Sequence, residues 1–406
     1  MVWKRCRPGS AVCFFLWMLS SGPTVEAYNI KAGPLNLSLG AQAGVEYSDN
    51  ANNSGTSPKE DFGFIAGPTI GGGLALPIRI GNSPEENLTM HFGTGFQYRY
   101  YLNEGQQTTF NSPSSLTLAL PLHLGEWLVT INDAFTYTDE PLDSLVAVGV
   151  RRPQQYNNLG SITGMRRFGR FALTLVGQRI DRWAPQTPST EETIYGFSVT
   201  PAVFLQEQFS VFWANSVGLV FPKDLTNRSE GLNITSMIGV SGQITPAIAG
   251  SVGIGFVHSQ FDPVQSGTST NTGSGTDGVS ANIGLNYSHP LRPNTSHAIS
   301  MFYTPGVTAT MDRSNYQTSY GVAYTISHRL NRTLTFSPMI GWTHSQNESG
   351  GFQSEFDMLL LGVGIQRSFT RHLSGRLTYR HQERSGNQPG QSYQVNQVTI
   401  TFTYAF

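Results

Sequence analysis

The chain has 406 residues, with 25 Lys and Arg against 26 Asp and Glu, so its formal net charge is −1. This balance gives no reason to propose a nucleic-acid partner, which would require a basic surface. Hydrophobic residues make up 38% of the chain. After residue 27, no segment approaches the roughly 20 consecutive apolar residues of a membrane-spanning helix.

Residues 1–27 match the pattern of a secretory leader. Three basic residues precede an apolar run and a small-x-small triplet: Lys4, Arg5 and Arg7, then Ala11–Leu19, then Val25–Ala27. We expect cleavage after Ala27 and export across the inner membrane. The only two cysteines, Cys6 and Cys13, lie in this leader. The remaining chain therefore lacks a thiol nucleophile, a disulfide and a Cys-ligated metal.

Apolar and polar residues alternate with a period of two over most of the chain, which is typical of β-strands with one apolar face. In residues 35–47, for example, Leu, Ala, Val and Tyr occupy one parity and mostly polar residues the other. The pattern predicts eighteen strands: 35–47, 62–80, 88–102, 114–124, 127–138, 156–168, 170–182, 193–205, 208–220, 231–244, 247–260, 278–289, 296–309, 316–328, 332–345, 355–368, 372–383 and 393–406. Prolines and glycines in 62–80, and the adjacent Arg166 and Arg167 in 156–168, weaken two of them, and without that pair sixteen would remain.

The connections between these segments alternate between long and short. Bacterial outer-membrane barrels have short periplasmic turns and longer extracellular loops. We therefore expect an all-β, antiparallel up-and-down transmembrane β-barrel of eighteen strands, with sixteen as the alternative, forming one domain over residues 28–406. A soluble β-sandwich also has alternating strands, but it would not require loops that alternate in length.

The last segment has Phe402, Tyr404 and Phe406 at alternate positions on its apolar face. This ending resembles the C-terminal assembly signal of Gram-negative outer-membrane β-barrels. The resemblance implies a location in the bacterial outer membrane, in contact with lipid and lipopolysaccharide. It also implies that the barrel-assembly machinery contacts the last strand.

The stretch from Gly44 to Asn50, Gly-Val-Glu-Tyr-Ser-Asp-Asn, is similar to the opening strand of a family of bacterial β-barrel porins linked to exopolysaccharide export. This resemblance implies a porin-like barrel and makes a polysaccharide a candidate solute.

Polar side chains on the parity opposite the apolar face are candidates to line a pore and contact solutes. They are Gln42, Glu46, His91, Gln97, Arg99, Arg376, Arg380 and Gln397. If the first and last strands close the barrel, Arg376 and Arg380 lie on one arc of the wall with Gln397, Gln42 and Glu46. Arginines in a water-filled pore attract anions. Alternatively, they pair with neighbouring acids and simply hydrate the lumen.

Aromatic residues recur near the predicted strand ends, as in Tyr98, Tyr100 and Trp213. Such residues form the interfacial girdles of membrane barrels, although they could also stack on sugars. Tyr101 has the opposite parity to Tyr98 and Tyr100, so it is the best candidate for an inward aromatic residue.

We expect no catalytic site, metal or cofactor. His258 and Ser259, like His344 and Ser345, are adjacent and so face opposite sides of a strand, while His372 and Ser374 begin at a predicted turn. The leading expectation is a channel for passive passage of small polar solutes with a weak preference for anions. A polysaccharide-export barrel and a structural or adhesive barrel without an open pore are the alternatives.

Overall fold

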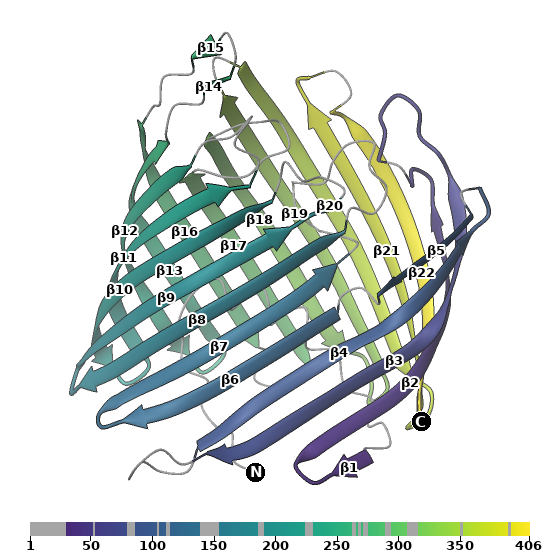
Figure 1. Cartoon of the computed structure of the whole chain (residues 1–406), viewed down its shortest axis with the longest axis horizontal. Coiled ribbons are helices and arrows are strands. Elements are labelled where there is room, and N and C mark those ends of the chain that lie inside the picture. The colour runs from purple at the N-terminus through teal and green to yellow at the C-terminus, as the bar shows by residue number, and fades with distance from the viewer. Residues whose placement is uncertain are drawn as a thin grey trace.

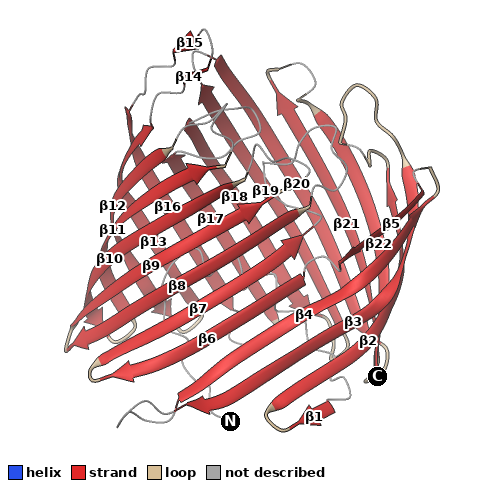
Figure 2. Cartoon of the chain, viewed as in Figure 1, coloured by secondary structure: helices blue, strands red, loops and turns tan. Residues whose placement is uncertain are grey.

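The computed structural model describes residues 30–406 except 52, 79–85, 104, 111–113, 139–153, 186–190, 224–229, 262–264, 267–268, 271–274, 289–293, 307–315, 350–351 and 389–390. The expected leader, residues 1–27, lies outside the described residues. Figure 2 shows strands and loops throughout this described part. No helix within these ranges is long and apolar enough to cross a membrane.

Eighteen long strands follow one another in chain order within the described residues. They are β2 Leu35–Ser48, β3 Asp61–Ile78, β4 Glu86–Tyr101, β6 Ser114–Leu124, β7 Trp127–Thr138, β8 Gln155–Phe168, β9 Phe171–Trp183, β10 Glu192–Gln206, β11 Phe209–Pro222, β12 Gly231–Thr245, β13 Ile248–Phe261, β16 Gly275–Ser288, β17 Thr295–Gly306, β18 Tyr316–Arg329, β19 Leu334–Ser349, β20 Phe352–Ser368, β21 Leu373–Gly386 and β22 Tyr393–Ala405.

Each long strand pairs antiparallel with the next, and the sheet closes on itself because β2 also pairs with β22 (Figure 1). Gly40 and Ala405 are partners at one end of this seam, and Ser48 and Gln397 at the other. Closure removes the sheet edges, so the backbone groups of the first and last long strands satisfy each other without water.

The prediction of an eighteen-strand transmembrane barrel is confirmed, and the sixteen-strand alternative is wrong. Strand β3 persists through its glycines because they admit a neighbouring ring: a Cβ on Gly72 would lie 2.7 Å from the Phe92 side chain. In β8 the adjacent arginines lie at the strand end, where they point to opposite sides. Arg166 pairs with Glu126, and Arg167 donates to the Gly169 carbonyl.

Four short strands were not predicted. They are β1 Ile30–Ala32, β5 Gly105–Phe110, β14 Gln265–Ser266 and β15 Ser269–Thr270. Strand β5 lies within residues 103–113, where the sequence predicted a loop. It forms because β6 pairs only with residues 89–93 of β4, which leaves the end of β4 free to pair with β5.

The six short connections, at 125–126, 169–170, 207–208, 246–247, 330–333 and 369–372, lie at one end of the barrel, which we call the turn end. Strand β1 and the C-terminal residue lie at this same end (Figure 1). We call the opposite end the loop end. Gly125 and Gly169 have φ values of +63° and +60°, which other residues adopt only at a steric cost, so glycine allows these turns to be short.

The outer face of the barrel is apolar and exposed. Ile131 and Ile162 are register partners on β7 and β8, and they are 41% and 57% exposed. Side chains of the opposite parity face the interior and are mostly polar. This inverts the arrangement of a soluble protein and is the distribution that a barrel surrounded by lipid requires.

Candidate functional site

The inner wall of β21 carries the two arginines that the sequence singled out. Arg376 and Arg380 have the parity opposite to Leu377 and Tyr379, which are exposed on the outer face. Across the next strand, β22, Arg380 is the register partner of Gln397. Both arginines therefore lie on the inward side, on the strand next to Gln397.

This wall continues across the barrel seam. The seam pairs Gln42 with Thr403 and Glu46 with Thr399, so Gln42 and Glu46 also face inward. Two strands further on, Arg99 of β4 pairs with Ile65 of β3. The structure thus brings six of the candidates onto four of five neighbouring strands, β21, β22, β2 and β4: Arg376, Arg380, Gln397, Gln42, Glu46 and Arg99. We call the inward arginines Arg99, Arg376, Arg380 and Arg384 the arginine arc.

The members of the arginine arc differ in their access to the lumen. Arg376 is exposed and Arg380 is partly exposed, whereas Arg99 is only 3% exposed and Arg384 is buried. Arg376 is therefore accessible from the inward side, whereas Arg99 and Arg384 are not.

A hydrogen-bonded cluster near the loop end holds part of the arginine arc in place. Arg380 donates to the amide oxygen of Gln382, whose amide nitrogen donates to the Tyr393 hydroxyl over 2.8 Å. The Arg384 guanidinium lies 3.9 Å from the centre of the Phe356 ring. A guanidinium held by such contacts is pre-oriented, which reduces the entropy lost when it binds an anion.

Sequence reasoning missed Arg384 and Tyr393. It placed the end of the strand at residue 383, whereas β21 runs to Gly386. Extending the inward parity by two residues from Gln382 would have found Arg384. Tyr393 is the register partner of Arg384 on the neighbouring strand β22, and the alternation within one strand does not show this pairing.

The remaining candidates lie apart from the arginine arc or have side chains outside the described part of the structure. His91 is exposed and inward, but its register partners are Gly73 and Thr117, nearer the turn end. The backbone of Gln97 pairs with Thr109 of β5, and its side chain is outside the described residues. Tyr101 has the inward parity, as expected, and is only 2% exposed.

An inward ion pair, separate from the arginine arc, lies on β9 and β10. The Arg182 guanidinium donates to the Glu192 carboxylate over 2.8 Å, and Glu192 is almost completely buried. These two charges compensate each other, so this part of the wall adds little net field to the lumen.

The histidines that precede serines contact acids on the outer face instead. His258 Nδ1 lies 2.7 Å from Asp277, and His344 Nδ1 lies 3.0 Å from Asp357. Ser259, by contrast, donates to Asn233 from the inner face. In neither His-Ser pair does the histidine contact the serine. Among the described side chains, no group of three or more His, Cys, Asp or Glu could hold a metal ion.

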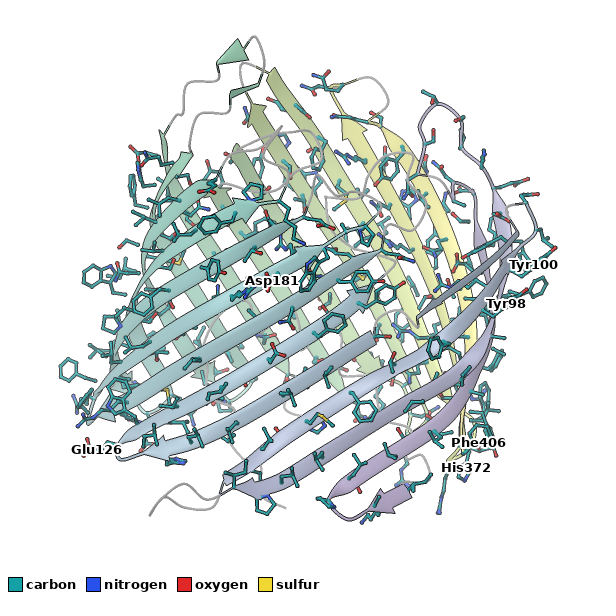
Figure 3. All side chains as sticks on the ribbon, viewed as in Figure 1. Tyr98, Tyr100, Glu126, Asp181, His372 and Phe406 are labelled. Carbon is teal, nitrogen blue, oxygen red and sulfur yellow. The ribbon has the colours of Figure 1, made fainter. Side chains whose placement is uncertain are left out.

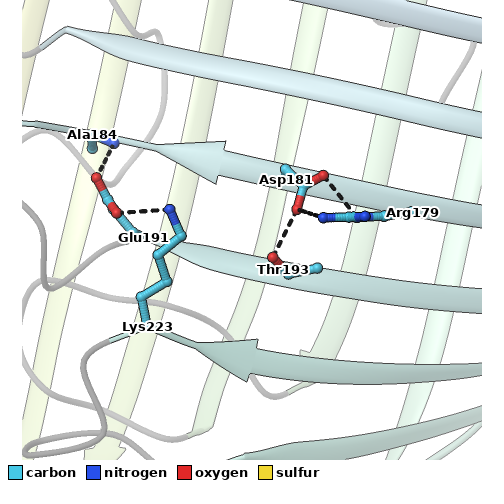
Figure 4. Close-up of polar contacts among 6 residues, drawn as sticks. All are labelled: Arg179, Asp181, Ala184, Glu191, Thr193 and Lys223. Atoms are coloured by element: carbon cyan, nitrogen blue, oxygen red, sulfur yellow. Dashed lines mark hydrogen bonds and ion pairs between the residues drawn. The ribbon is translucent and has the colours of Figure 1, made fainter.

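Aromatic and charged groups line the outer wall near the loop end. Tyr98 and Tyr100 project away from the barrel, while Phe406 and His372 lie at the turn end (Figure 3). Figure 4 shows two polar groups, one on β9 and β10 and one just beyond the loop ends of β9, β10 and β11. Arg179 pairs with Asp181, and Lys223 pairs with Glu191 over 3.1 Å.

The closed sheet, the exposed apolar outer face and the polar inner wall define a transmembrane β-barrel. No family model matches the chain, and no curated protein matches it. The resemblance to the exopolysaccharide-linked porins therefore gains no support from these comparisons.

Three solved structures are similar to this chain. OccAB3 of Acinetobacter baumannii has 12% identity and a TM-score of 0.46, over 92% of this chain and 99% of that one. OccK2 (OpdF) of Pseudomonas aeruginosa, solved in complex with glucuronate, has 11% identity and a TM-score of 0.46, over 92% and 98%. A BenF-like porin of Pseudomonas fluorescens Pf-5 has 9% identity and a TM-score of 0.46, over 91% and 99%. At such values the likeness says nothing about substrate, and the fold assignment rests on the strand pairing.

Proposed function

We propose that the protein is an outer-membrane channel through which small polar solutes pass passively, with a weak preference for anions. The observation that carries this proposal is the arginine arc, with Arg376 exposed on the inward face. Four arginines lie on the inward face of β4 and β21, whereas Glu46 and Asp61 are the acids on the inward faces of β2 and β3. The local field therefore favours anions.

The size of the barrel supports a channel. Barrels of 16–18 strands enclose a lumen wide enough for water, whereas barrels of about eight strands are filled by their own side chains. The expected leader and the aromatic last strand support a location in the outer membrane.

Polysaccharide export is not favoured by any observation on this wall. That function would need a continuous, accessible polar and aromatic track along Arg376, Arg380, Arg99 and Tyr101. Arg99 and Tyr101 are buried. The accessible track is therefore interrupted at these two residues. Among the described residues, no contact supports a structural or adhesive role.

The test compares the purified barrel with the Arg376→Ala/Arg380→Ala variant in a planar bilayer under a salt gradient. The expected result is a reversal potential that indicates anion preference and moves toward cations in the variant. Arg367→Ala, which removes a charge of the outward parity on β20, is the matched control and should leave the reversal potential unchanged. Equal reversal potentials in all three proteins would contradict the role of the arginine arc.

A further inference from the structure

The outer wall over β7, β8 and β9 carries charged residues where a lipid-facing wall should be apolar. Asp133 has the same parity on β7 as Ile131, which is exposed on the outer face. Arg179 has the same parity on β9 as the exposed Phe171, and its own side chain is 57% exposed. Both ionisable side chains therefore point away from the lumen.

These charges lie within the height of the membrane. Asp133 is near the middle of β7, Trp127–Thr138, and Arg179 lies in the half of β9 nearer the loop end. A strand tilted by about 40° rises roughly 2.5 Å per residue along the membrane normal, so Asp133 lies about 15 Å and Arg179 about 20 Å above the turn end. Both fall within an apolar band about 25 Å tall. Facing lipid is costly for an arginine, by roughly 2–4 kcal/mol at the midplane and about 0–1 kcal/mol near the interface, and less for an aspartate.

Contacts within the barrel pair Arg179 with an acid, but among the described residues they leave Asp133 without a cation. The Asp133 carboxylate accepts a hydrogen bond from the Asn158 amide over 3.1 Å, and within the described part of the chain no cation pairs with it. Arg179 pairs with Asp181 over 2.9 Å, and Asp181 also accepts from the Thr193 hydroxyl (Figure 4). A cation from outside the chain would stabilise the Asp133 carboxylate, and the phosphate groups of lipids do not supply one.

Gly160 lies directly between Asp133 and Arg179. It is the register partner of Asp133 on one side and of Arg179 on the other. The three residues thus form a row across the outer wall: an acid, a residue without a side chain, and a base. A Cβ on Gly160 would meet only the Asp133 carboxylate, at an ordinary distance of 3.7 Å. Packing within the barrel therefore does not require glycine at this position.

We propose that this row is the centre of a homodimer interface, in which a second copy of this chain docks across Gly160. All copies in a membrane have the same orientation, so a two-fold axis must run along the membrane normal. An axis at Gly160 would bring Asp133 of each copy toward Arg179 of the other, as an isologous interface requires. The height difference between the two residues, about 5 Å from the same strand geometry, is within reach of an arginine side chain.

The surroundings of the row suit a protein neighbour. Ile162 on β8 and Phe197 on β10 are large exposed apolar residues on the same face, and they would form an apolar rim around the charge pairs. The absence of a side chain at Gly160 allows the two walls to approach closely. This inference concerns the outer wall and does not rest on the channel function.

The test uses Gly160→Cys, because a residue on a two-fold axis meets its own copy. Residues 28–406 have no cysteine, so the introduced thiol would be the only one after leader cleavage. Oxidation in isolated outer membranes should convert most of the protein to a disulfide-linked dimer. Ile254→Cys, an exposed outward residue on β13, is the matched control and should remain monomeric.

A second variant separates dimerisation from folding. Gly160→Leu has room within its own barrel but would obstruct a neighbour, so native mass spectrometry should show wild-type dimers and Gly160→Leu monomers. Both should keep a heat-modifiable gel band and the same conductance per barrel. A monomeric wild-type mass with no Gly160→Cys dimer would overturn the proposal, as would a Gly160→Cys disulfide to a different protein.

Discussion

Arg376 on β21 and Arg99 on β4 lie on the same row of the inner wall. Four consecutive register pairs connect them, through Thr401, Gly44 and Ile65. Their surroundings differ, because Arg376 is exposed and Arg99 is buried. The two arginines should therefore respond differently to substitution.

We expect Arg376→Ala to change ion selectivity with little effect on stability, and Arg99→Ala to destabilise the barrel. Removing a buried, partnered charge typically costs about 3–5 kcal/mol, whereas an exposed substitution costs about 0.5 kcal/mol or less. Guanidinium unfolding and bilayer reversal potentials measure the two effects. Equal losses of stability in both variants would show that Arg376 is not free in the lumen.

Hydrogen bonds connect the start of the first loop to the last strand. The Asn50 amide donates to the Gln394 carbonyl over 2.8 Å and to the Ser54 carbonyl over 2.9 Å, and Asn50 is buried. Asn50→Ala removes these bonds, and we expect a loss of about 1–3 kcal/mol. The thermal midpoint of the folded gel band measures it. Asn387→Ala, which removes one bond at an exposed residue, is the control, and an equal shift in both variants would contradict a specific fastening role.

The last residue contributes little packing within the barrel. Phe406 is 58% exposed, and its backbone N–H donates to the Leu39 carbonyl. Phe406→Ala keeps that bond, so the unfolding free energy of refolded protein should change by about 0.5 kcal/mol or less. If the barrel-assembly machinery recognises the aromatic C-terminus, Phe406→Ala should lower the amount of folded barrel in cells several-fold.

Phe256→Ala provides the matched control for this prediction, since Phe256 is a similarly exposed outward aromatic residue on β13. It should lower neither the cellular amount nor the stability. A loss of refolded stability in Phe406→Ala would instead indicate that the residue acts through packing.

The backbone conformation at Gly242 requires a glycine. Gly242 has φ +152°, and a Cβ there would lie 2.0 Å from the Gln208 carbonyl oxygen. Gly242→Ala should destabilise the barrel by about 1–3 kcal/mol. Gly177→Ala, with nothing within 4 Å of the added Cβ, should be neutral or slightly stabilising in the same guanidinium titration. A neutral Gly242→Ala would show that the backbone at the β10–β11 turn adapts readily.

The strands were predictable because a membrane barrel requires each strand to alternate between lipid and lumen. Residues 114–124 and 127–138 were predicted to the residue. Strand ends were less certain where polar residues occupy both parities, as between Glu383 and Gly386, and Arg384 was missed for this reason.

Relations between strands were harder to predict, because register depends on loop geometry and closure. The alternation alone indicates that Asp133 and Arg179 face outward. It does not show that Gly160 lies between them, because that alignment is set by the pairing of three strands. The contact between Gln382 and Tyr393 likewise depends on the register of β21 with β22, in which Tyr393 is the partner of Arg384.

The most direct test of the channel is the single-channel conductance of protein purified from outer membranes after expression of the full chain. The barrel is first shown to be folded by its heat-modifiable gel band and then inserted into a planar bilayer under a salt gradient. We predict steady conductance with a reversal potential on the anion side. A folded barrel that gives no conductance, or one that prefers cations, would contradict the account.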